Sequence, residues 1–397
     1  MAMNNPTLGA WNIADLRDLA RRRLPKGLFE FMDRGCEDEV SLRNNRAAFE
    51  RIKLKPRVLN DVSKRNQEIT LFGHKQNMPI AIAPTGTPGI MWYEGELELA
   101  RAAKKAGIPF TLATTTLTAM ERIVDEVGGR LWFQLYMYAD RSLSRWIAER
   151  AKNAGYEALI ITVDSPTFSN REYNLRNGFT IPVTYSLKNT LDVVSHPRWM
   201  LGVWLRYLLE GGLPLFENYP PEVKARVKAA PMGRAMKLND ALNWDDVREM
   251  RKLWPRTLMI KGVLSPADAA IAADCGVDGV IVSNHGGRVV DGAMAPIDAL
   301  PAMLDAVGKR MTVIVDSGFR RGSDVVKAMA LGAHAVLVGR ATLYGVAAAG
   351  EAGGTRALNI LREEIDRVMA LVGSRSIDEL TRELLAMPAP LRIAHAA

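Results

Sequence analysis

The feature that most constrains the fold is an alternation, repeated eight times from Met78 onward, of short apolar runs with longer helical patterns. The runs are rich in β-branched residues, and this alternation is typical of βα units around a parallel sheet. Strands are predicted at 78–84, 110–114, 131–137, 158–164, 258–263, 279–284, 312–317 and 335–340, and helices at 95–106, 142–154, 265–274, 322–331 and 355–372. Eight strands are the number that closes a (β/α)8 (TIM) barrel. An open doubly wound sheet is the alternative, but the turn at 84–89, PTGTPG, is not the GxGxxG turn typical of that fold.

The barrel is predicted to have an N-terminal helical arm. Apolar residues recur at helical spacing from Ile13 to Leu24, Pro25 interrupts the pattern, and a second helix is predicted through Leu28 and Met32. The predicted organisation is an arm with lead-in strands at 1–77, a barrel domain at 78–375 and a C-terminal tail at 376–397.

A long insertion separates the fourth and fifth predicted strands. Residues 183–240 are basic and rich in aromatic residues, and Arg198 and Arg206 exclude a membrane-spanning segment. Leucines and aromatics with basic neighbours are typical of a segment at a membrane interface, so peripheral membrane contact is expected through 183–237. Packing on the barrel or on a neighbouring subunit is the alternative.

The composition restricts the partners. Lys and Arg outnumber Asp and Glu by 52 to 44, giving a net charge of +8, which favours an anionic substrate, a phosphate-bearing cofactor or a lipid surface. No nucleic-acid-binding motif is present. Cys36 and Cys275 lie in no metal or disulfide motif, so no metal site is expected. Without a signal-peptide pattern, a cytoplasmic location is predicted, with a possible peripheral position on the cytoplasmic face of the inner membrane.

Polar residues collect where each predicted strand ends. In a (β/α)8 barrel the active site lies at this end, where the βα loops converge. The residues concerned are Thr85, Thr114, Gln134, Tyr136, Thr162, Asp164, Lys261, Ser283, His285, Arg288, Asp316, Arg320, Gly339 and Arg340. A single one of them, such as Thr114 or Thr162, has a structural explanation, but agreement at eight strand ends indicates an active site.

Three of these residues carry specific chemistry. His285 is either an ordinary loop histidine or a general base oriented by Asp164. Lys261 is either a Schiff-base nucleophile or a fixed cation beside an anionic group. The loops after the seventh and eighth strands commonly bind phosphate in barrels, so a phosphorylated ligand is expected near 316–322 and 339–340.

Four blocks in this order resemble the FMN-dependent (S)-2-hydroxy-acid oxidase and dehydrogenase family, which includes glycolate oxidase, L-lactate dehydrogenase and L-mandelate dehydrogenase. The blocks are Lys261-Gly262, the SNHGGR of 283–288, the DSGFRRG of 316–322 and Gly339-Arg340. The similarity extends from Leu24 to about Leu371, and SNHGGR with its upstream lysine is highly specific. The resemblance implies FMN as cofactor and a homotetramer.

Site roles follow from this resemblance, position by position. It implies FMN contacts at Pro84, Thr85, Gly86, Thr114, Gln134, Thr162, Lys261 and Ser283, and phosphate contacts at Asp316, Ser317, Gly318, Arg320, Gly339 and Arg340. His285, paired with Asp164, would accept the substrate hydroxyl proton as hydride leaves Cα for flavin N5, or would remove the Cα proton in a carbanion route. Arg171 and Arg288 would bind the substrate carboxylate, Tyr136 would hydrogen-bond the substrate, and Lys261 would lie near flavin N1.

Two positions depart from the family pattern. Phe31 stands where a substrate-binding tyrosine is usual, so a bulkier or more apolar substrate, or an ester or lactone, is expected. Ala113 replaces a flavin-contacting serine, which leaves that contact to Thr114 or the backbone. Gly86 resembles the glycine found at this position in the dehydrogenase branch of the family. Together with the insertion, it favours a quinone or another membrane acceptor for the electrons. An oxygen-using oxidase is the alternative, followed by a barrel aldolase or isomerase with a Schiff base on Lys261.

Overall fold

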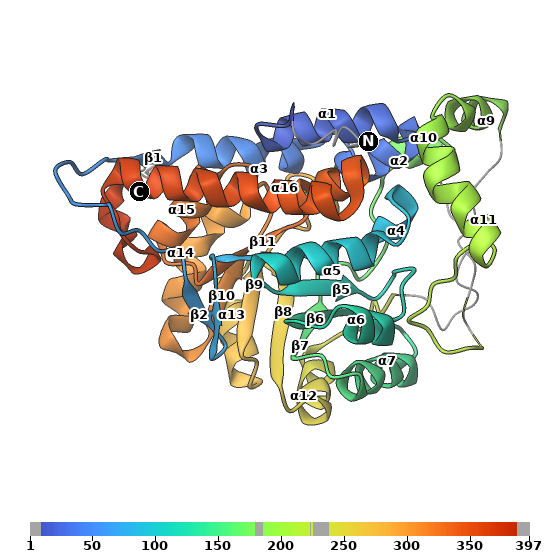
Figure 1. Cartoon of the computed structure of the whole chain (residues 1–397). Helices are drawn as coiled ribbons and strands as arrows, with labels where there is room; N and C mark the ends of the chain where they lie inside the picture. The colour runs from blue at the N-terminus through green and yellow to red at the C-terminus, as the bar shows by residue number, and fades with distance from the viewer. Residues whose placement is uncertain (1–8, 179–185, 223, 225–237, 387–397) are drawn as a thin grey trace, which may run out of the picture.

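The centre of the molecule is a closed barrel of parallel strands, as the sequence predicts (Figure 1). The computed structural model describes residues 9–178, 186–222, 224 and 238–386. The barrel strands are β4 (Ile80–Ile82), β5 (Phe110–Ala113), β6 (Leu131–Tyr136), β7 (Ala158–Thr162), β8 (Thr257–Val263), β9 (Gly279–Val282), β10 (Thr312–Val315) and β11 (Ala335–Val338). They follow chain order around the barrel, which closes where β11 pairs with β4. All eight predicted strands are confirmed, with ends shifted by a few residues.

The barrel is filled by side chains and is plugged at one end. Trp132, Ile160, Met259 and Leu337 are among the inward-facing residues, and all of them are buried. A hairpin of β2 (Ile69–Leu71) and β3 (His74–Gln76) adds its Leu71 to this cluster. Because the plug covers the N-terminal end of the strands, the polar residues that follow the strands are left at the opposite end.

Helices surround the barrel and bury a second apolar layer against the outer side of the strands. They are α4 (Pro88–Met91), α5 (Gly95–Ala106), α6 (Met120–Glu126), α7 (Arg141–Asn153), α12 (Trp244–Leu253), α13 (Pro266–Asp274), α14 (Pro296–Val307), α15 (Gly322–Leu331) and α16 (Arg340–Val372). The predicted helix at 355–372 is the second half of α16, which bends at Ala349 and Gly350. At the bend, a Cβ on Gly345 would lie 2.2 Å from the carbonyl oxygen of Gly353, so this close approach requires glycine.

The N-terminal arm contains α1 (Ile13–Arg23), α2 (Lys26–Asp33) and α3 (Val40–Arg51), and α1 lies along α16 (Figure 1). The sequence pattern predicted the first two helices but not α3. The buried face of α3 includes Ser41 and Asn45 beside Ala48 and Phe49, so it lacks the apolar periodicity that identifies a helix. The arm is tied to the tail where β1 (Lys53–Leu54) pairs with β12 (Leu385–Ala386).

The described part of the insertion forms short helices at the edge of the molecule (Figure 1). They follow α8 (Glu172–Arg176) and comprise α9 (Leu187–Val194), α10 (Pro197–Trp199), a π-helical turn η2 (Met200–Leu205) and α11 (Arg206–Glu210). Within the predicted insertion, residues 183–185, 223 and 225–237 lie outside the described residues, as does 387–397 of the predicted tail. None of the described helices is long and apolar enough to cross a membrane.

Candidate active site

A row of buried polar side chains crosses the ends of β5, β6 and β7. Gln134 Nε2 donates a hydrogen bond of 3.0 Å to Thr162 Oγ1, and the Thr114 hydroxyl donates one of 2.6 Å to the Gln134 carbonyl. The strand register places Tyr136 beside Thr162, and Thr162 beside Lys261. The residues expected to contact FMN on these strands therefore lie together. The Thr114 hydroxyl hydrogen is donated to the backbone of β6.

Lys261 is held as a cation at the end of β8. Its Nζ donates to Ser283 Oγ at 3.0 Å and forms an ion pair of 3.1 Å with Asp316. Burial alone would lower the pKa of Lys261, but the charges of Asp316 and Asp164 outweigh it and raise the pKa above its ordinary value. A Schiff-base nucleophile needs a neutral amine, so these surroundings favour the fixed cation. The pairing with Asp316 was not predicted from the sequence.

His285 and Asp164 form the predicted pair across the barrel mouth. His285 Nδ1 lies 3.0 and 3.2 Å from the two carboxylate oxygens of Asp164, and Nε2 lies 3.5 Å from the Tyr136 hydroxyl. Burial, helped by the nearby positive charge of Lys261, lowers the pKa of His285 although Asp164 opposes this. The neutral imidazole can donate from Nδ1 to Asp164, which leaves the Nε2 lone pair as a proton acceptor.

Asp164 remains ionised in this buried position. Burial opposes its charge, but the hydrogen bond from His285 and the charge of Lys261 hold its pKa below the ordinary value. Gly262 leaves room for it, because a Cβ at Gly262 would lie 2.5 Å from both Cβ and Cγ of Asp164. The backbone of Gly262 also has a φ of 103°, which few other residues adopt.

Two arginines lie beside this pair. Arg288 Nη1 donates to the carbonyls of Phe31 and Arg34 at 2.8 and 2.9 Å, and its guanidinium lies 5.3 Å from the Phe31 ring centre. Arg171 donates to Ser169 Oγ and to the Arg288 carbonyl. Burial and the charge of Arg288 lower the pKa of Arg171 to about 10. Among the described residues, the hydrogen-bond acceptors given for both arginines are hydroxyl and carbonyl oxygens, so an anionic ligand would offset part of their combined positive charge.

The loops after β9, β10 and β11 meet at the predicted phosphate site. The amide of Gly286 donates to Ser317 Oγ at 3.0 Å, and Arg320 lies 5.5 Å from the ring centre of Tyr344. Arg340 donates to the carbonyls of Met32, Arg34 and Gly286 at 3.0, 2.9 and 2.8 Å. Arg340 therefore braces the arm against the barrel, a function that the sequence did not reveal.

The residues at the barrel mouth fit FMN. Gln134, Thr162, Ser283 and the cation of Lys261 form a buried polar floor for a planar heteroaromatic ring with carbonyl and ring nitrogen atoms. Helix α16 begins at Arg340 directly after β11, and a helix N-terminus beside arginines suits a phosphate. Pro84, Thr85 and Gly86 follow β4 next to this position, since a Cβ on Gly339 would lie 3.5 Å from Thr85 Cγ2.

A buried asparagine pair supports the SNHGGR turn and was also missed from the sequence. Asn284 and Asn45 exchange amide hydrogen bonds of 2.7 and 2.9 Å, and Asn284 Oδ1 accepts the Gly287 amide at 3.1 Å. Asn284 is part of a motif, but Asn45 comes from α3, in a stretch without one. Only the folded chain brings the two together.

Comparison with known proteins identifies the family. The family model described as FMN-dependent dehydrogenase matches residues 20–387. The chain belongs to this family. This FMN-dependent dehydrogenase is 42% identical over 377 residues to (S)-mandelate dehydrogenase of Pseudomonas putida, with 94% of this chain and 93% of the relative covered. It is 38% identical to L-lactate dehydrogenase of Pectobacterium atrosepticum over 381 residues, covering 96% and 97%.

A solved structure agrees with this assignment. The crystal structure of the monotopic membrane protein (S)-mandelate dehydrogenase superposes with a TM-score of 0.90 at 42% identity, covering 96% of this chain and all of that one. The predicted family, barrel fold, oxidoreductase class and FMN cofactor are confirmed. The aldolase or isomerase alternative is thereby set aside, while the roles of individual site residues remain predictions.

Proposed function

We propose that this FMN-dependent dehydrogenase oxidises an (S)-2-hydroxy acid to the 2-oxo acid with His285 as the base. The observation that carries this proposal is the placement of His285, whose Nδ1 faces Asp164 and whose Nε2 lies 3.5 Å from the Tyr136 hydroxyl; burial lowers its pKa, which favours the neutral imidazole. Its Nε2 accepts the proton of the substrate hydroxyl, and Asp164 stabilises the imidazolium that results. The same nitrogen is the base for the Cα proton if the carbanion route operates.

The other site residues bind and orient the substrate. Arg171 and Arg288 bind the carboxylate, whose negative charge offsets part of the positive charge of the two guanidinium groups. Tyr136 donates its hydroxyl hydrogen to the substrate, and burial together with Asp164 raises its pKa, so it stays protonated. Bound FMN supplies the two-electron acceptor for the hydrogen on Cα, and Lys261 is the fixed cation beside it.

We propose an aromatic or branched 2-hydroxy acid as the substrate, within the range marked by relatives named for mandelate and lactate. Phe31 supports this choice because its ring offers an apolar surface under Arg288 instead of a hydroxyl donor. Esters and lactones belong in the substrate panel, because one expected carboxylate donor is missing.

We propose that the insertion lies on a membrane and that electrons pass to a quinone or another membrane acceptor. The insertion surface, defined as the exposed apolar residues of α9 to α11, supports this; its members are Leu187, Leu191, Val194, Leu201, Leu205, Leu208 and Leu209. A segment that lies at a membrane interface needs helices that expose apolar side chains on one face. The monotopic relative also supports it. A homotetramer on the cytoplasmic face of the inner membrane completes the proposal.

Anaerobic bleaching of bound flavin tests the reaction. Wild-type protein should lose its flavin absorbance with (S)-2-hydroxy acids, whereas His285→Ala should keep its flavin and be reduced about 10²- to 10⁴-fold more slowly, the usual contribution of a general base. His74→Ala, on the exposed face of β3 at the plugged end of the barrel, is the matched control. Rapid reduction of His285→Ala would refute the assignment of the base. Fast reoxidation by oxygen but not by quinone would favour the oxidase alternative.

A further inference from the structure

Arg34, in the turn after α2, contacts three βα loops of the barrel mouth. Its carbonyl oxygen accepts hydrogen bonds of 2.9 Å from both Arg288 and Arg340, which follow β9 and β11. Its guanidinium lies 5.6 Å from the ring centre of Tyr173, in the short helix α8 of the connection after β7. Tyr173 is two residues beyond Arg171, so Arg34 contacts the surroundings of both arginines proposed to bind the carboxylate.

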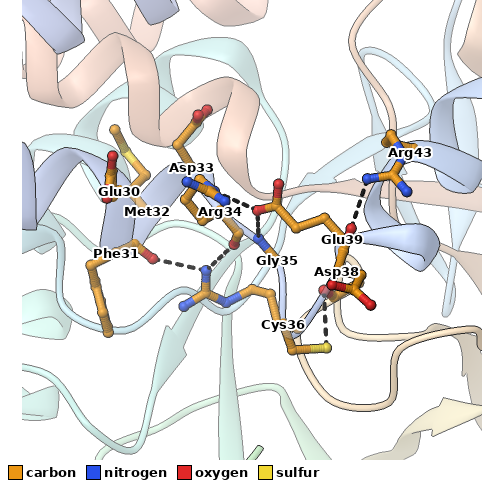
Figure 2. A network of polar contacts seen from close by, with 12 residues as sticks. Glu30, Phe31, Met32, Asp33, Arg34, Gly35, Cys36, Asp38, Glu39 and Arg43 are labelled. Carbon is orange, nitrogen blue, oxygen red and sulfur yellow. Dashed lines mark hydrogen bonds and ion pairs between the residues drawn. The ribbon is translucent and has the colours of Figure 1, made fainter. Parts of the chain in front are cut away.

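The Arg34 side chain also fixes the conformation of its own turn. Arg34 Nε donates to Glu39 Oε1 at 2.6 Å, and the Gly35 amide donates to the same oxygen at 2.8 Å (Figure 2). Figure 2 shows the two carbonyls of Phe31 and Arg34 hydrogen-bonded to one guanidinium, with Arg34 joined to Glu39 on the other side. The pair with Glu39 therefore holds the peptide whose oxygen Arg288 and Arg340 share.

Neighbouring backbone contacts connect the same segment to the same loops. The Cys36 amide donates to the Gly287 carbonyl, and the Glu37 amide donates to the Asn170 carbonyl, each at 3.1 Å. Gly287 precedes Arg288, and Asn170 precedes Arg171. Residues 34–37 thus bridge the two loops from which the proposed carboxylate ligands extend, and Arg34 contributes both its side chain and the carbonyl that Arg288 binds.

We propose that Arg34 is a positioning residue for carboxylate recognition, acting through the orientation of Arg288. This inference rests on the proposed function, because it assumes that Arg288 binds the substrate carboxylate. Replacing the Arg34 side chain keeps the backbone carbonyl that Arg288 binds. It removes the contacts with Glu39 and Tyr173 that fix the position of this carbonyl. Arg288 then samples more orientations. The substrate carboxylate therefore loses more binding free energy than the uncharged part of the substrate does.

The test compares a 2-hydroxy acid with its neutral amide. Dissociation constants are measured by anaerobic flavin reduction with (S)-mandelate and by perturbation of flavin absorbance with its amide. Arg34→Ala should weaken acid binding by about 2- to 12-fold, the equivalent of one net hydrogen bond, and change amide binding less than twofold. Arg34→Lys, which can still reach Glu39, should restore part of the loss. Flavin content should not change, because Arg340 keeps the Met32 and Gly286 carbonyls.

Arg375→Ala is the matched control, since Arg375 makes the same type of pair with Glu379, at 2.8 Å, away from the barrel mouth. Equal loss of acid and amide binding in Arg34→Ala would mean a structural role only and would overturn the inference, as would unchanged binding of both. If Arg34→Ala does not fold, the inference is tested with Arg34→Lys, by the same comparison of the dissociation constants for the acid and the amide. Absence of wild-type reduction by any 2-hydroxy acid would overturn the proposed function and this inference together.

Discussion

At the residue scale, the site keeps a neutral buried base beside a charged buried lysine. His285 is neutral because burial and the charge of Lys261 lower its pKa, whereas Lys261 remains charged because Asp316 and Asp164 lie beside it. Asp164 faces both groups. It therefore orients the imidazole in the resting site and is ready to stabilise the imidazolium once a proton has been accepted.

This arrangement predicts the pH dependence of flavin reduction. His285 must be unprotonated to accept a proton, and its pKa lies below the ordinary 6.5, so the rate constant per substrate concentration should be level above pH 6.5. It should fall, by about tenfold per pH unit, only below the lowered pKa. In Asp164→Asn the acid limb should move to still lower pH, because the charge that raises the His285 pKa is gone, and the maximal rate should fall. Stopped-flow reduction from pH 4.5 to 9 measures both, and an acid limb above 6.5 would contradict the prediction.

Phe31→Tyr tests the unusual residue at the barrel mouth. The new hydroxyl should lie near Arg288 and supply an additional donor to the substrate carboxylate, so lactate should bind about 2- to 12-fold more tightly. A methyl ester of the same acid serves as an internal control and should gain less. Titration of flavin reduction measures both constants. Equal affinities for lactate before and after the change would mean that the missing hydroxyl does not limit binding.

At the scale of elements, the insertion is attached by its polar and aromatic residues and leaves its leucines outside. Trp199 Nε1 donates to the Ile90 carbonyl at 2.7 Å, and the Tyr207 hydroxyl donates to the Gly89 carbonyl at 3.2 Å. Arg206 lies 3.9 Å from the Tyr93 ring centre. These contacts hold α10 and α11 against α4 and the residues that follow it, in the loop after β4, so the insertion surface has a fixed orientation relative to the barrel mouth.

Negative charge placed on the insertion surface should weaken membrane binding. Replacing Leu191, Leu205 and Leu208 by Glu removes exposed apolar area and adds negative charge, so binding to anionic lipid vesicles should fall at least about tenfold. Flavin content and reduction by substrate should not change. Leu371→Glu, an exposed leucine at the far end of α16, is the control in the co-sedimentation assay. Persistent vesicle binding would argue that this surface packs on another subunit instead.

At the scale of the whole molecule, the barrel was predictable and the contacts that complete its mouth were not. Each strand is a short, mostly buried and mostly apolar run, and the polar residues at and after the strand ends mark the active end. Periodicity missed α3 because Ser41 and Asn45 lie on its buried face. Arg34 lies in no motif, and its importance depends on partners that only tertiary folding brings near. Local patterns thus predicted which polar residues gather at the barrel mouth, but not the arm residues that contact them.

The bracing of the arm by Arg340 has a consequence for the order of synthesis. The carbonyls of Met32 and Arg34 accept hydrogen bonds from Arg340, which is synthesised 308 and 306 residues after them. A nascent chain that ends just after Arg288, in the loop after β9, already carries Asp164, His285 and Arg288, but it lacks β10, the strand β11 that closes the barrel against β4, and Arg340, which shares the Arg34 carbonyl. The reacting groups are therefore synthesised before the strands and the arginine that fix their positions. A chain truncated between Arg288 and β11 contains the reacting groups but cannot form the complete site.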